Sequence, residues 1–393
     1  MTENGNGALS GVRILDLTSY LAGPYGASLL GDSGADVIKV EPPDGDMMRH
    51  YPTTLASESR AFLGANRNKR GIVVDLKKPE GRRVIFDLVG QVDVLIQNFR
   101  PSVPPRLGVD YETLSAINPR LIYCGLTGYG EQGPWRDNAG FDQVLQSMSG
   151  IAAFQGGDGP PQVVVGSIVD YYASSLIAYG VSAALYRREL SGKGQRISVS
   201  LLRTAIAMQA GRFIWAESEP REVSRELRPG RTAGIHPTGE GYLYISAHST
   251  HFWQSLCDCL GLPQLAADPR YDDMRKRAER ADELLPLMHA ALATRTAEEW
   301  ERIMLGKVPC ARVRQVEDMF DDPQIIAEHL VTTLDHPRVG RYRTMTKPIV
   351  FSDTPGPPDL PAPVLGEHTD EILREIGYSN DAIDVLRRSG VVA

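Results

Sequence analysis

The sequence predicts an α/β fold in which a mostly parallel β-sheet is covered by helices. Short apolar runs typical of buried strands alternate with helical patterns over the first 130 residues. This alternation is the pattern of βαβ units, whose strands lie parallel in one sheet. The length of 393 residues indicates two domains, or one large domain with a smaller appendage.

The elements of this first part follow one another in a regular order. Strands are expected at residues 12–17, 35–40, 72–76, 92–96 and 121–123, and helices at residues 22–31 and 80–89. Pro24 suits the first turn of the earlier helix, because the N–H that proline lacks needs no partner there. The apolar residues of the later helix recur on one face and are Val84, Ile85, Leu88 and Val89.

The remainder of the chain suggests a second, smaller α+β domain. A turn and a strand are expected at residues 193–201, and the charged segment 221–234 is expected to be a linker or a mobile loop. From residue 241 to about 328 the pattern gives one short strand, at 242–245, and then helices. We therefore predict a large domain over residues 1–220, a small domain over 225–328, and a C-terminal segment over 331–393. That segment is Pro-rich at 354–363, helical from Glu367, and expected to return to the large domain.

Composition excludes several classes of function. The formal net charge of -7 argues against broad nucleic-acid binding and against a basic membrane patch. The four cysteines have no zinc-like spacing, so buried thiols in a reducing compartment are expected and no metal is. The N-terminus has no apolar signal core, and no uninterrupted apolar run reaches about 18 residues. The chain is therefore expected in the cytoplasm, away from membranes and nucleic acid.

Asp170 is the strongest candidate for chemistry. A short apolar run and Gly166 precede it, and a helical pattern leaves from it and ends near Gly192. A carboxylate at a helix N-terminus is favoured in its ionised form and could act as a nucleophile. The same position is also typical of an ordinary N-cap, and these residues alone leave both interpretations open.

Other motifs are less specific. Residues 128–133 fit G-x-G-x-x-G, but Pro134 follows and no apolar helix opens, so a glycine-rich turn is expected rather than a nicotinamide or flavin site. No G-x-S-x-G elbow supports a hydrolase triad. Basic residues gather at 66–70 and at Lys77, Lys78, Arg100 and Arg106, near predicted strand ends. Such a cluster suggests a phosphate-bearing ligand.

Taken together, these segments resemble the class III CoA-transferase family, also called the CaiB/BaiF family. The resemblance runs over almost the whole chain in the family's order and spacing. It is carried by residues 11–17, 22–24, 34–42, 68–70, 93–101, 106–108, 192–195, 308–310 and 365–369.

The resemblance implies a Rossmann-like large domain, a small domain, and a homodimer of two subunits threaded through each other as interlocked rings. It implies that Asp170 is a catalytic nucleophile that carries coenzyme A during each turnover. The substrates would be an acyl-CoA and a carboxylic acid, with no tightly bound cofactor. The helix N-terminus would keep the Asp170 carboxylate ionised between half-reactions.

The resemblance also implies contacts to coenzyme A, although the sequence departs from some family members at two positions. Pro42 stands where some members have an arginine, and Ala139 where some have a lysine. The expected contact residues are Tyr20, Leu21, Ala22, Val74, Asp75, Leu76, Lys77, Asn98, Phe99, Arg100, Arg106, Phe141 and Asp142. The glycine-rich lid that some members place over the active aspartate has no obvious counterpart, and the loop 229–234 is a candidate for it whose role the sequence leaves open.

Two alternatives to a transferase remain. The same family contains α-methylacyl-CoA racemases, which resemble this chain but have a histidine where it has Phe141 and a glutamate near Ser249. Phenylalanine cannot move a proton, so a two-base racemisation would lack one base. The second alternative is a non-catalytic CoA-binding protein in which Asp170 is only a helix cap.

Overall fold

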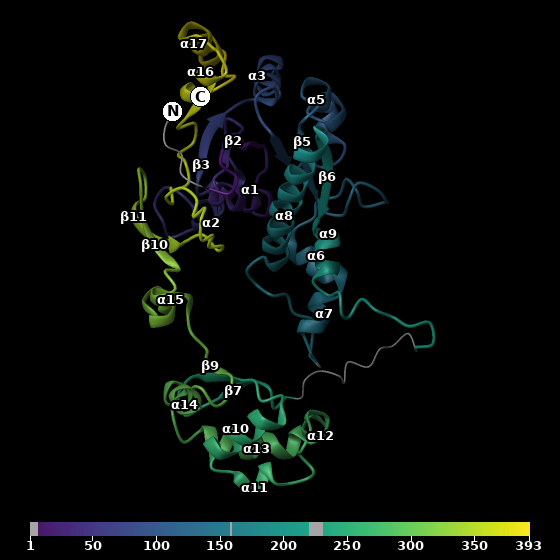
Figure 1. Cartoon of the computed structure of the whole chain (residues 1–393), viewed down its shortest axis with the longest axis vertical. Helices are drawn as coiled ribbons and strands as arrows, with labels where there is room; N and C mark the ends of the chain where they lie inside the picture. Colours follow the sequence, from purple (N-terminus) through teal and green to yellow (C-terminus); the bar gives the residue numbers. More distant parts are fainter. Residues whose placement is uncertain (1–6, 158, 220–230) are drawn as a thin grey trace. The chain divides into compact units, whose positions relative to one another are not determined.

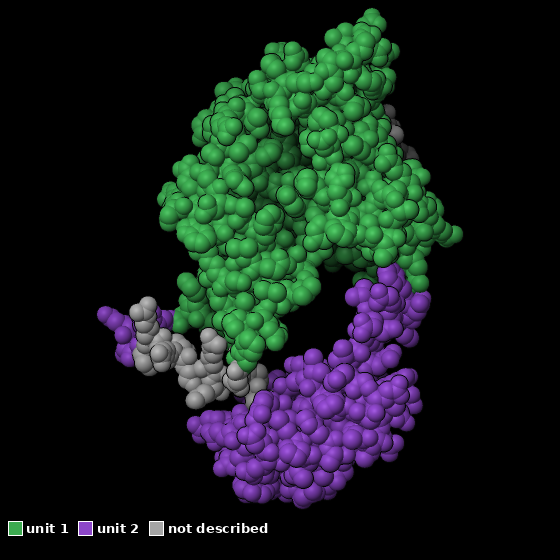
Figure 2. Space-filling model, turned by 180° about the vertical axis from the view of Figure 1, so that it is seen from behind, with its two compact units in different colours: residues 1–214, 326–393 green, residues 215–325 purple. Residues whose placement is uncertain are grey.

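The computed structural model describes residues 7–157, 159–219 and 231–393, which fall into two compact units (Figure 2). The first unit takes in the chain up to Ile214 and again from Ile326 to Ala393, and the second spans Trp215–Ile325. The first unit therefore contains both ends of the chain, and the second is one continuous insertion.

A six-stranded, wholly parallel sheet forms the centre of the first unit (Figure 1). Its order is β3-β2-β1-β4-β5-β6, which is the strand order of a Rossmann fold. The strands are β1 (Arg13–Asp16), β2 (Asp36–Glu41), β3 (Lys69–Val73), β4 (Val94–Gln97), β5 (Ile122–Thr127) and β6 (Gln195–Ser200). The predicted parallel sheet is confirmed.

Alternate strand residues point to opposite faces of the sheet, and each face has its own core. Ile14 packs with α1 and α8, while its neighbour Leu15 packs with α3 and the C-terminal helices. Both faces are thus covered, as a parallel sheet requires. The other helices of the first unit are α1 (Ala22–Asp32), η1 (Met47–His50), α2 (Arg60–Ala65), α3 (Pro79–Val89), α4 (Val103–Leu107), α5 (Tyr111–Ile117), α6 (Asp142–Ser149), α7 (Ile151–Gln155), α8 (Ile168–Ser191) and α9 (Leu201–Ala207).

The strand expected at residues 72–76 lies three residues earlier, at β3. Lys69 opens this strand with its side chain fully buried, and its Nζ lies 2.8 Å from the Asp16 carboxylate. A lysine is normally a surface residue, so a pattern of apolar residues places the start of this strand too late.

The C-terminal segment packs on the first unit. It contains the hairpin β10 (Val331–His336) and β11 (Gly340–Met345), then α16 (Thr369–Glu375) and α17 (Asn380–Arg388). His368 exchanges two hydrogen bonds with Gly71 of β3, at 2.9 and 3.1 Å, and Thr369 accepts the N–H of Val73. This segment therefore closes the edge of the sheet at β3.

Helix α8 is long and apolar enough, by length and composition alone, to cross a membrane. Its inward residues, including Val169, Ile177 and Val181, are completely buried in the core of the first unit. The helix thus serves as a core helix in this fold, which explains its apolar composition.

The second unit contains a three-stranded antiparallel sheet and several helices. Its strands are β7 (Gly234–Pro237), β8 (Tyr242–Ile245) and β9 (Cys310–Arg312), so the expectation of a single strand after residue 241 is wrong. Strand β9 has only three residues, with the sequence Cys-Ala-Arg, and so lacks the run of apolar residues that predicts a buried strand. The helices are α10 (Thr250–Leu260), α11 (Pro263–Ala266), α12 (Met274–Glu279), α13 (Ala281–Leu292), α14 (Ala297–Met304) and η3 (Val316–Asp321), with α15 (Pro323–Ala327) at the boundary of the units.

Candidate functional site

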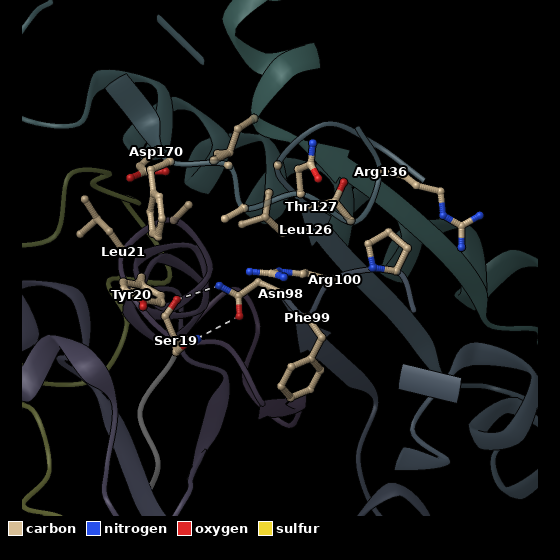
Figure 3. Close-up of a pocket in the computed structure, with 18 residues that line it drawn as sticks. Ser19, Tyr20, Leu21, Asn98, Phe99, Arg100, Leu126, Thr127, Arg136 and Asp170 are labelled. Atoms are coloured by element: carbon tan, nitrogen blue, oxygen red, sulfur yellow. Dashed lines mark hydrogen bonds between the residues drawn. The ribbon is translucent and has the colours of Figure 1, made fainter. Parts of the chain in front are cut away.

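A cleft that is partly open to solvent lies at the carboxyl ends of β1, β4 and β5 (Figure 3). The connections from β1 and β4 run in opposite directions along the sheet, and open α/β sheets bind ligands at such a switch point. The lining residues are Ser19, Tyr20, Leu21, Ala22, Asn98, Phe99, Arg100, Pro101, Leu126, Thr127, Gly128, Arg136, Asn138, Ala139, Gly140, Phe141, Asp170 and Leu201.

Asp170 lies in the first turn of α8 and reaches this cleft. Ser167 is the N-cap residue, in a left-handed conformation with φ 59°, and its side chain makes no capping bond. The cap is supplied instead by Asp142, whose Oδ2 accepts the backbone N–H of Val169 at 2.6 Å and of Asp170 at 3.0 Å. Asp170 is therefore not the cap of its own helix.

Asp142 is only 1% exposed and opens helix α6. The Gln146 side chain donates to its other oxygen and exchanges hydrogen bonds of 2.8 and 2.9 Å with the backbone of Val164. Asp142 and Gln146 together hold the segment that leads into α8. Asp142 thus does not line the cleft but lies directly beneath the residue that does.

The carboxyl of Asp170 has an unusual environment. Burial, and then the negative charge of Asp142, raise its pKa from 3.8 to about 7. Within the described residues, no side chain or backbone N–H donates to its carboxylate oxygens. The expectation that the helix N-terminus keeps this group ionised is therefore wrong, because the N–H groups of that terminus bind Asp142 instead.

The turn between β1 and α1 forms one wall of the cleft. Asn98 fixes Ser19 by two hydrogen bonds, accepting its N–H at 3.0 Å and donating to its carbonyl at 2.7 Å (Figure 3). The next residue, Tyr20, has a left-handed backbone with φ 67° and is 40% exposed. Its ring meets Phe141 edge-on, with 5.5 Å between the ring centroids. Aromatic side chains thus border the cleft close to Asp170.

Two arginines line the cleft. Arg136 pairs with Asp137 at 3.1 Å, whereas Arg100 has no carboxylate partner in the part of the chain that the structure describes. The basic residues at 66–70 are not available to an anion, because carboxylates of this chain neutralise them. The pairs are Arg67 with Asp32, Lys69 with Asp16, and Arg70 with Asp36.

The expected contact residues divide into two groups. The cleft brings together those that follow β1 and β4, which are Tyr20, Leu21, Ala22, Asn98, Phe99 and Arg100, with Phe141 and Asp170. Six others do not line this cleft: the buried Asp142, the exposed Arg106 of α4, and Val74, Asp75, Leu76 and Lys77, which follow β3. Residues 229 and 230 of the candidate lid lie outside the described residues. Among the described residues, no group of three His, Cys, Asp or Glu side chains could hold a metal ion.

The residues at the end of β5 were not expected in the site. The predicted strand stopped at Tyr123, because Gly125 interrupts the apolar run, whereas β5 continues to Thr127. The glycine-rich segment that follows is the predicted turn rather than a nucleotide loop. A Cβ on Gly128 would lie 2.9 Å from the Cα of Gly140, so both ends of this loop need glycine to approach. The signal that could have found these residues is the rule that parallel strands present their carboxyl ends to a ligand.

The raised pKa of Asp170 predicts a pH-dependent stability. Because the folded chain binds a proton that the unfolded chain releases between about pH 4 and pH 7, its stability falls as pH rises through that range. Asp170→Asn removes this effect, so its melting temperature should exceed that of the wild type by about 2 °C or more at pH 8. The difference should shrink at pH 5, as measured by thermal unfolding at both values. The matched control is Asp353→Asn at an exposed acid, and an equal difference at both pH values would contradict the assignment.

Comparison with known proteins identifies the family. The model of CoA-transferase family III matches residues 9–369. A succinyl-CoA:glutarate CoA-transferase of Mus musculus is 34% identical, covering 98% of this chain and 90% of that protein. A succinyl-CoA–D-citramalate CoA-transferase of Chloroflexus aurantiacus is also 34% identical, covering 98% of both chains. A crystal structure of a CaiB/BaiF family protein from Brucella suis superposes with a TM-score of 0.83 at 31% identity, covering 94% of this chain and all of that one.

These matches span nearly the whole chain and confirm the resemblance drawn from the sequence. The chain belongs to CoA-transferase family III and is an enzyme that transfers coenzyme A from an acyl-CoA to a carboxylic acid.

Proposed function

We propose that Asp170 is the nucleophile of this CoA transfer and that the cleft at the ends of β1, β4 and β5 holds the acyl-CoA. The observation that carries the proposal is a carboxyl group that reaches the switch-point cleft, has no hydrogen-bond donor among the described residues, and has a pKa raised to about 7. Strongly perturbed carboxyls in clefts are typical of catalytic groups. A carboxyl used only for packing would be expected to have hydrogen-bond partners.

The reaction proceeds in two matched halves. The ionised carboxylate of Asp170 attacks the thioester carbonyl, the C–S bond breaks, and CoA thiolate leaves behind a mixed anhydride. The thiolate then attacks the aspartyl carbonyl, which releases the donor acid and leaves coenzyme A on Asp170 as a thioester. An acceptor carboxylate repeats the two steps in reverse and departs as the new acyl-CoA. Atoms and charge balance without an oxidant, a reductant or a further cofactor.

The environment of Asp170 suits both halves. A poorly solvated carboxylate with a raised pKa is more basic and more nucleophilic than one in water. Helix α1 begins beside the cleft without a side-chain cap, so its first N–H groups are free to bind a substrate oxygen that becomes negative. Leu21 and Ala22 of this start line the cleft.

Arg100, and beyond the cleft Arg106, would bind the phosphates of coenzyme A. The relatives are named for succinyl-CoA and for short dicarboxylic acids, so we propose succinyl-CoA as donor and a dicarboxylate as acceptor.

The racemase alternative lacks its two bases. Phe141 stands at one of the expected positions, and its ring meets that of Tyr20 edge-on. Ser249, at the other, is the N-cap of α10 and accepts the N–H of Phe252. Neither side chain can exchange a proton with an α-carbon near pH 7, which favours transfer over racemisation.

A homodimer working in the cytoplasm is also part of the proposal. The outward face of α8 carries large side chains at helical spacing, with Tyr179 75%, Tyr186 70% and Leu190 64% exposed. Such a face on a single chain is typical of a surface that another protein covers. A second copy, threaded as in the interlocked rings that the family implies, would cover it.

The nucleophile assignment predicts a covalent adduct. After incubation with succinyl-CoA, hydroxylamine or borohydride should modify the peptide that contains Asp170, as seen by mass spectrometry. Asp170→Asn should lose both the adduct and at least about 10³-fold of the exchange rate, because Asp170 is the one carboxyl group among the residues that line the cleft. The control Asp353→Asn should keep both. Full exchange by Asp170→Asn would refute the assignment.

The charge of Asp142 predicts a shift in the pH dependence of acylation. The rate of adduct formation should rise with pH and level off above about 7, since only the ionised carboxylate attacks. Asp142→Asn removes the nearby negative charge, so the midpoint should move to lower pH, though not to 3.8, because burial is the larger cause. Gln146→Ala is the matched control: it removes the Gln146–Asp142 contact but keeps the charge, and its midpoint should stay in place. An unchanged midpoint in Asp142→Asn would exclude this electrostatic coupling.

The dimer predicts a measurable assembly state. The wild type should have twice the mass of the 43.1 kDa chain by light scattering after gel filtration. Tyr179→Glu combined with Tyr186→Glu should give the mass of a single chain, because two charges would be buried in the interface. Ile117→Glu, an exposed site on α5, should stay dimeric. A monomeric wild type would contradict the proposal.

A further inference from the structure

In the turn between β1 and α1, the backbone N–H groups of three successive residues, Thr18, Ser19 and Tyr20, donate to side chains. Tyr20 has φ 67°, a region that residues with a Cβ rarely adopt. It is one of four non-glycine residues with positive φ among those described, and it lines the proposed acyl-CoA cleft. Something must stabilise this conformation, because a strained backbone persists only where its surroundings over-determine it.

Asp46 provides that stabilisation. Its Oδ1 accepts the backbone N–H of Tyr20 at 3.1 Å and that of Met48 at 2.9 Å. Its Oδ2 pairs with the Nζ of Lys39 at 2.9 Å, and both side chains are at most 1% exposed. Lys39 Nζ also donates to the carbonyl of Thr18, two residues before Tyr20, at 2.9 Å. The buried ion pair of Asp46 and Lys39 therefore binds backbone groups of Tyr20 and Thr18, one on each side of Ser19.

The Asp46–Lys39 pair is itself held in place by Glu41 and Arg49. The backbone N–H of Asp46 donates to Glu41 at 2.9 Å, and Glu41 forms a two-point pair with Arg49. Although burial opposes it, attraction to Asp46 and Asp16 raises the pKa of Lys39, so the lysine stays charged. A charge held in this way keeps its geometry, since moving either partner would leave the other buried alone.

We propose that Asp46, held by Lys39, is a positioning residue for acyl-CoA binding. It does not touch the cleft; it holds Tyr20 left-handed and so aims the Tyr20 ring and the start of α1 at the substrate. The inference rests on the proposed function for its substrate, but the conformational part stands on the fold alone. Loss of the hydrogen bond from Tyr20 to Asp46 should weaken binding of coenzyme A more than it slows the chemical steps. The reason is that the backbone of Asp170 is held separately, by Asp142.

The test is a double-mutant cycle with two matched substitutions at residue 20. Tyr20→Gly and Tyr20→Ala both remove the ring, but only glycine adopts positive φ without strain. Asp46→Asn cannot satisfy the two N–H groups and the Lys39 ammonium at once, because one side of the amide is a donor. In the wild type and in Tyr20→Ala, Asp46→Asn should raise the KM for succinyl-CoA and the dissociation constant of free CoA about tenfold, with kcat changed less than threefold.

In the Tyr20→Gly background, the same Asp46→Asn change should raise the KM for succinyl-CoA and the dissociation constant of free CoA less than threefold. A glycine at residue 20 adopts positive φ without the hydrogen bond to Asp46. Asp32→Asn is the control: it breaks an equally buried pair, Asp32 with Arg67, that does not contact the turn. It should lower stability without moving either constant in any background. Equal effects of Asp46→Asn in the glycine and alanine backgrounds would overturn the proposal.

Thermal unfolding separates this proposal from the function on which it rests. Tyr20→Gly should melt above Tyr20→Ala in the otherwise unaltered chain, whatever the enzyme's substrates, and this comparison needs no folded Asp46 variant. An alanine variant as stable as the glycine variant would overturn the positioning role. If the glycine variant is the more stable but no acyl-CoA exchanges with any acid, the conformational hold stands and the proposed function fails.

Discussion

The two hydrogen bonds from the first turn of α8 to Asp142 determine what the site can do. They satisfy N–H groups that a helix otherwise leaves without partners, and so fix where α8 begins. They also place a negative charge beside Asp170 and occupy the positive end of the helix that would have stabilised its carboxylate. One carboxylate therefore does the structural work and leaves the other poorly solvated and reactive. The same residue type at the same helix end serves as cap in one case and as candidate nucleophile in the other.

The cleft also depends on charges that are buried beneath it. Lys69 with Asp16 and Lys39 with Asp46 lie under the turn after β1, with side chains at most 1% exposed. Burial lowers the pKa of Lys69 to about 8 although the charge of Asp16 opposes this shift. Removing one partner of such a pair costs about 3–5 kcal/mol, whereas apolar residues of similar volume would often serve stability as well. Their presence under the cleft is explained by the backbone groups they hold rather than by stability.

How far the sequence predicts this structure depends on the range of the interactions involved. The parallel sheet follows from local apolar runs, and Asp170 could be singled out from a glycine, a short strand-like run and a long helix pattern. The role of Asp142 could not be predicted in this way, because the residues whose N–H groups it accepts are 27 and 28 positions further along the chain. From the sequence alone, Asp142 could equally be an ordinary aspartate in a loop. Strand β3 was placed late because Lys69, a charged residue, opens it inside the core. The prediction that Asp170 stays ionised was wrong for the same reason, because the pKa of this carboxyl depends on its tertiary contact with Asp142 and not on the helix alone.

Two residues with a strained, left-handed backbone lie next to the cleft. Ser167 and Tyr20, two of the four non-glycine residues with positive φ among those described, precede Asp170 and the start of α1 respectively. Each introduces a helix whose first turn lines the cleft, and each is followed within three residues by a side chain that faces the substrate region. A left-handed residue turns the chain sharply before a helix, so the helix start points into the cleft rather than along the sheet. The separate anchors, Asp142 for α8 and Asp46 for the turn before α1, hold the proposed nucleophile and the proposed binding wall independently. Substitutions at one anchor should consequently leave the other in place, so the proposed roles in binding and in chemistry can be tested separately.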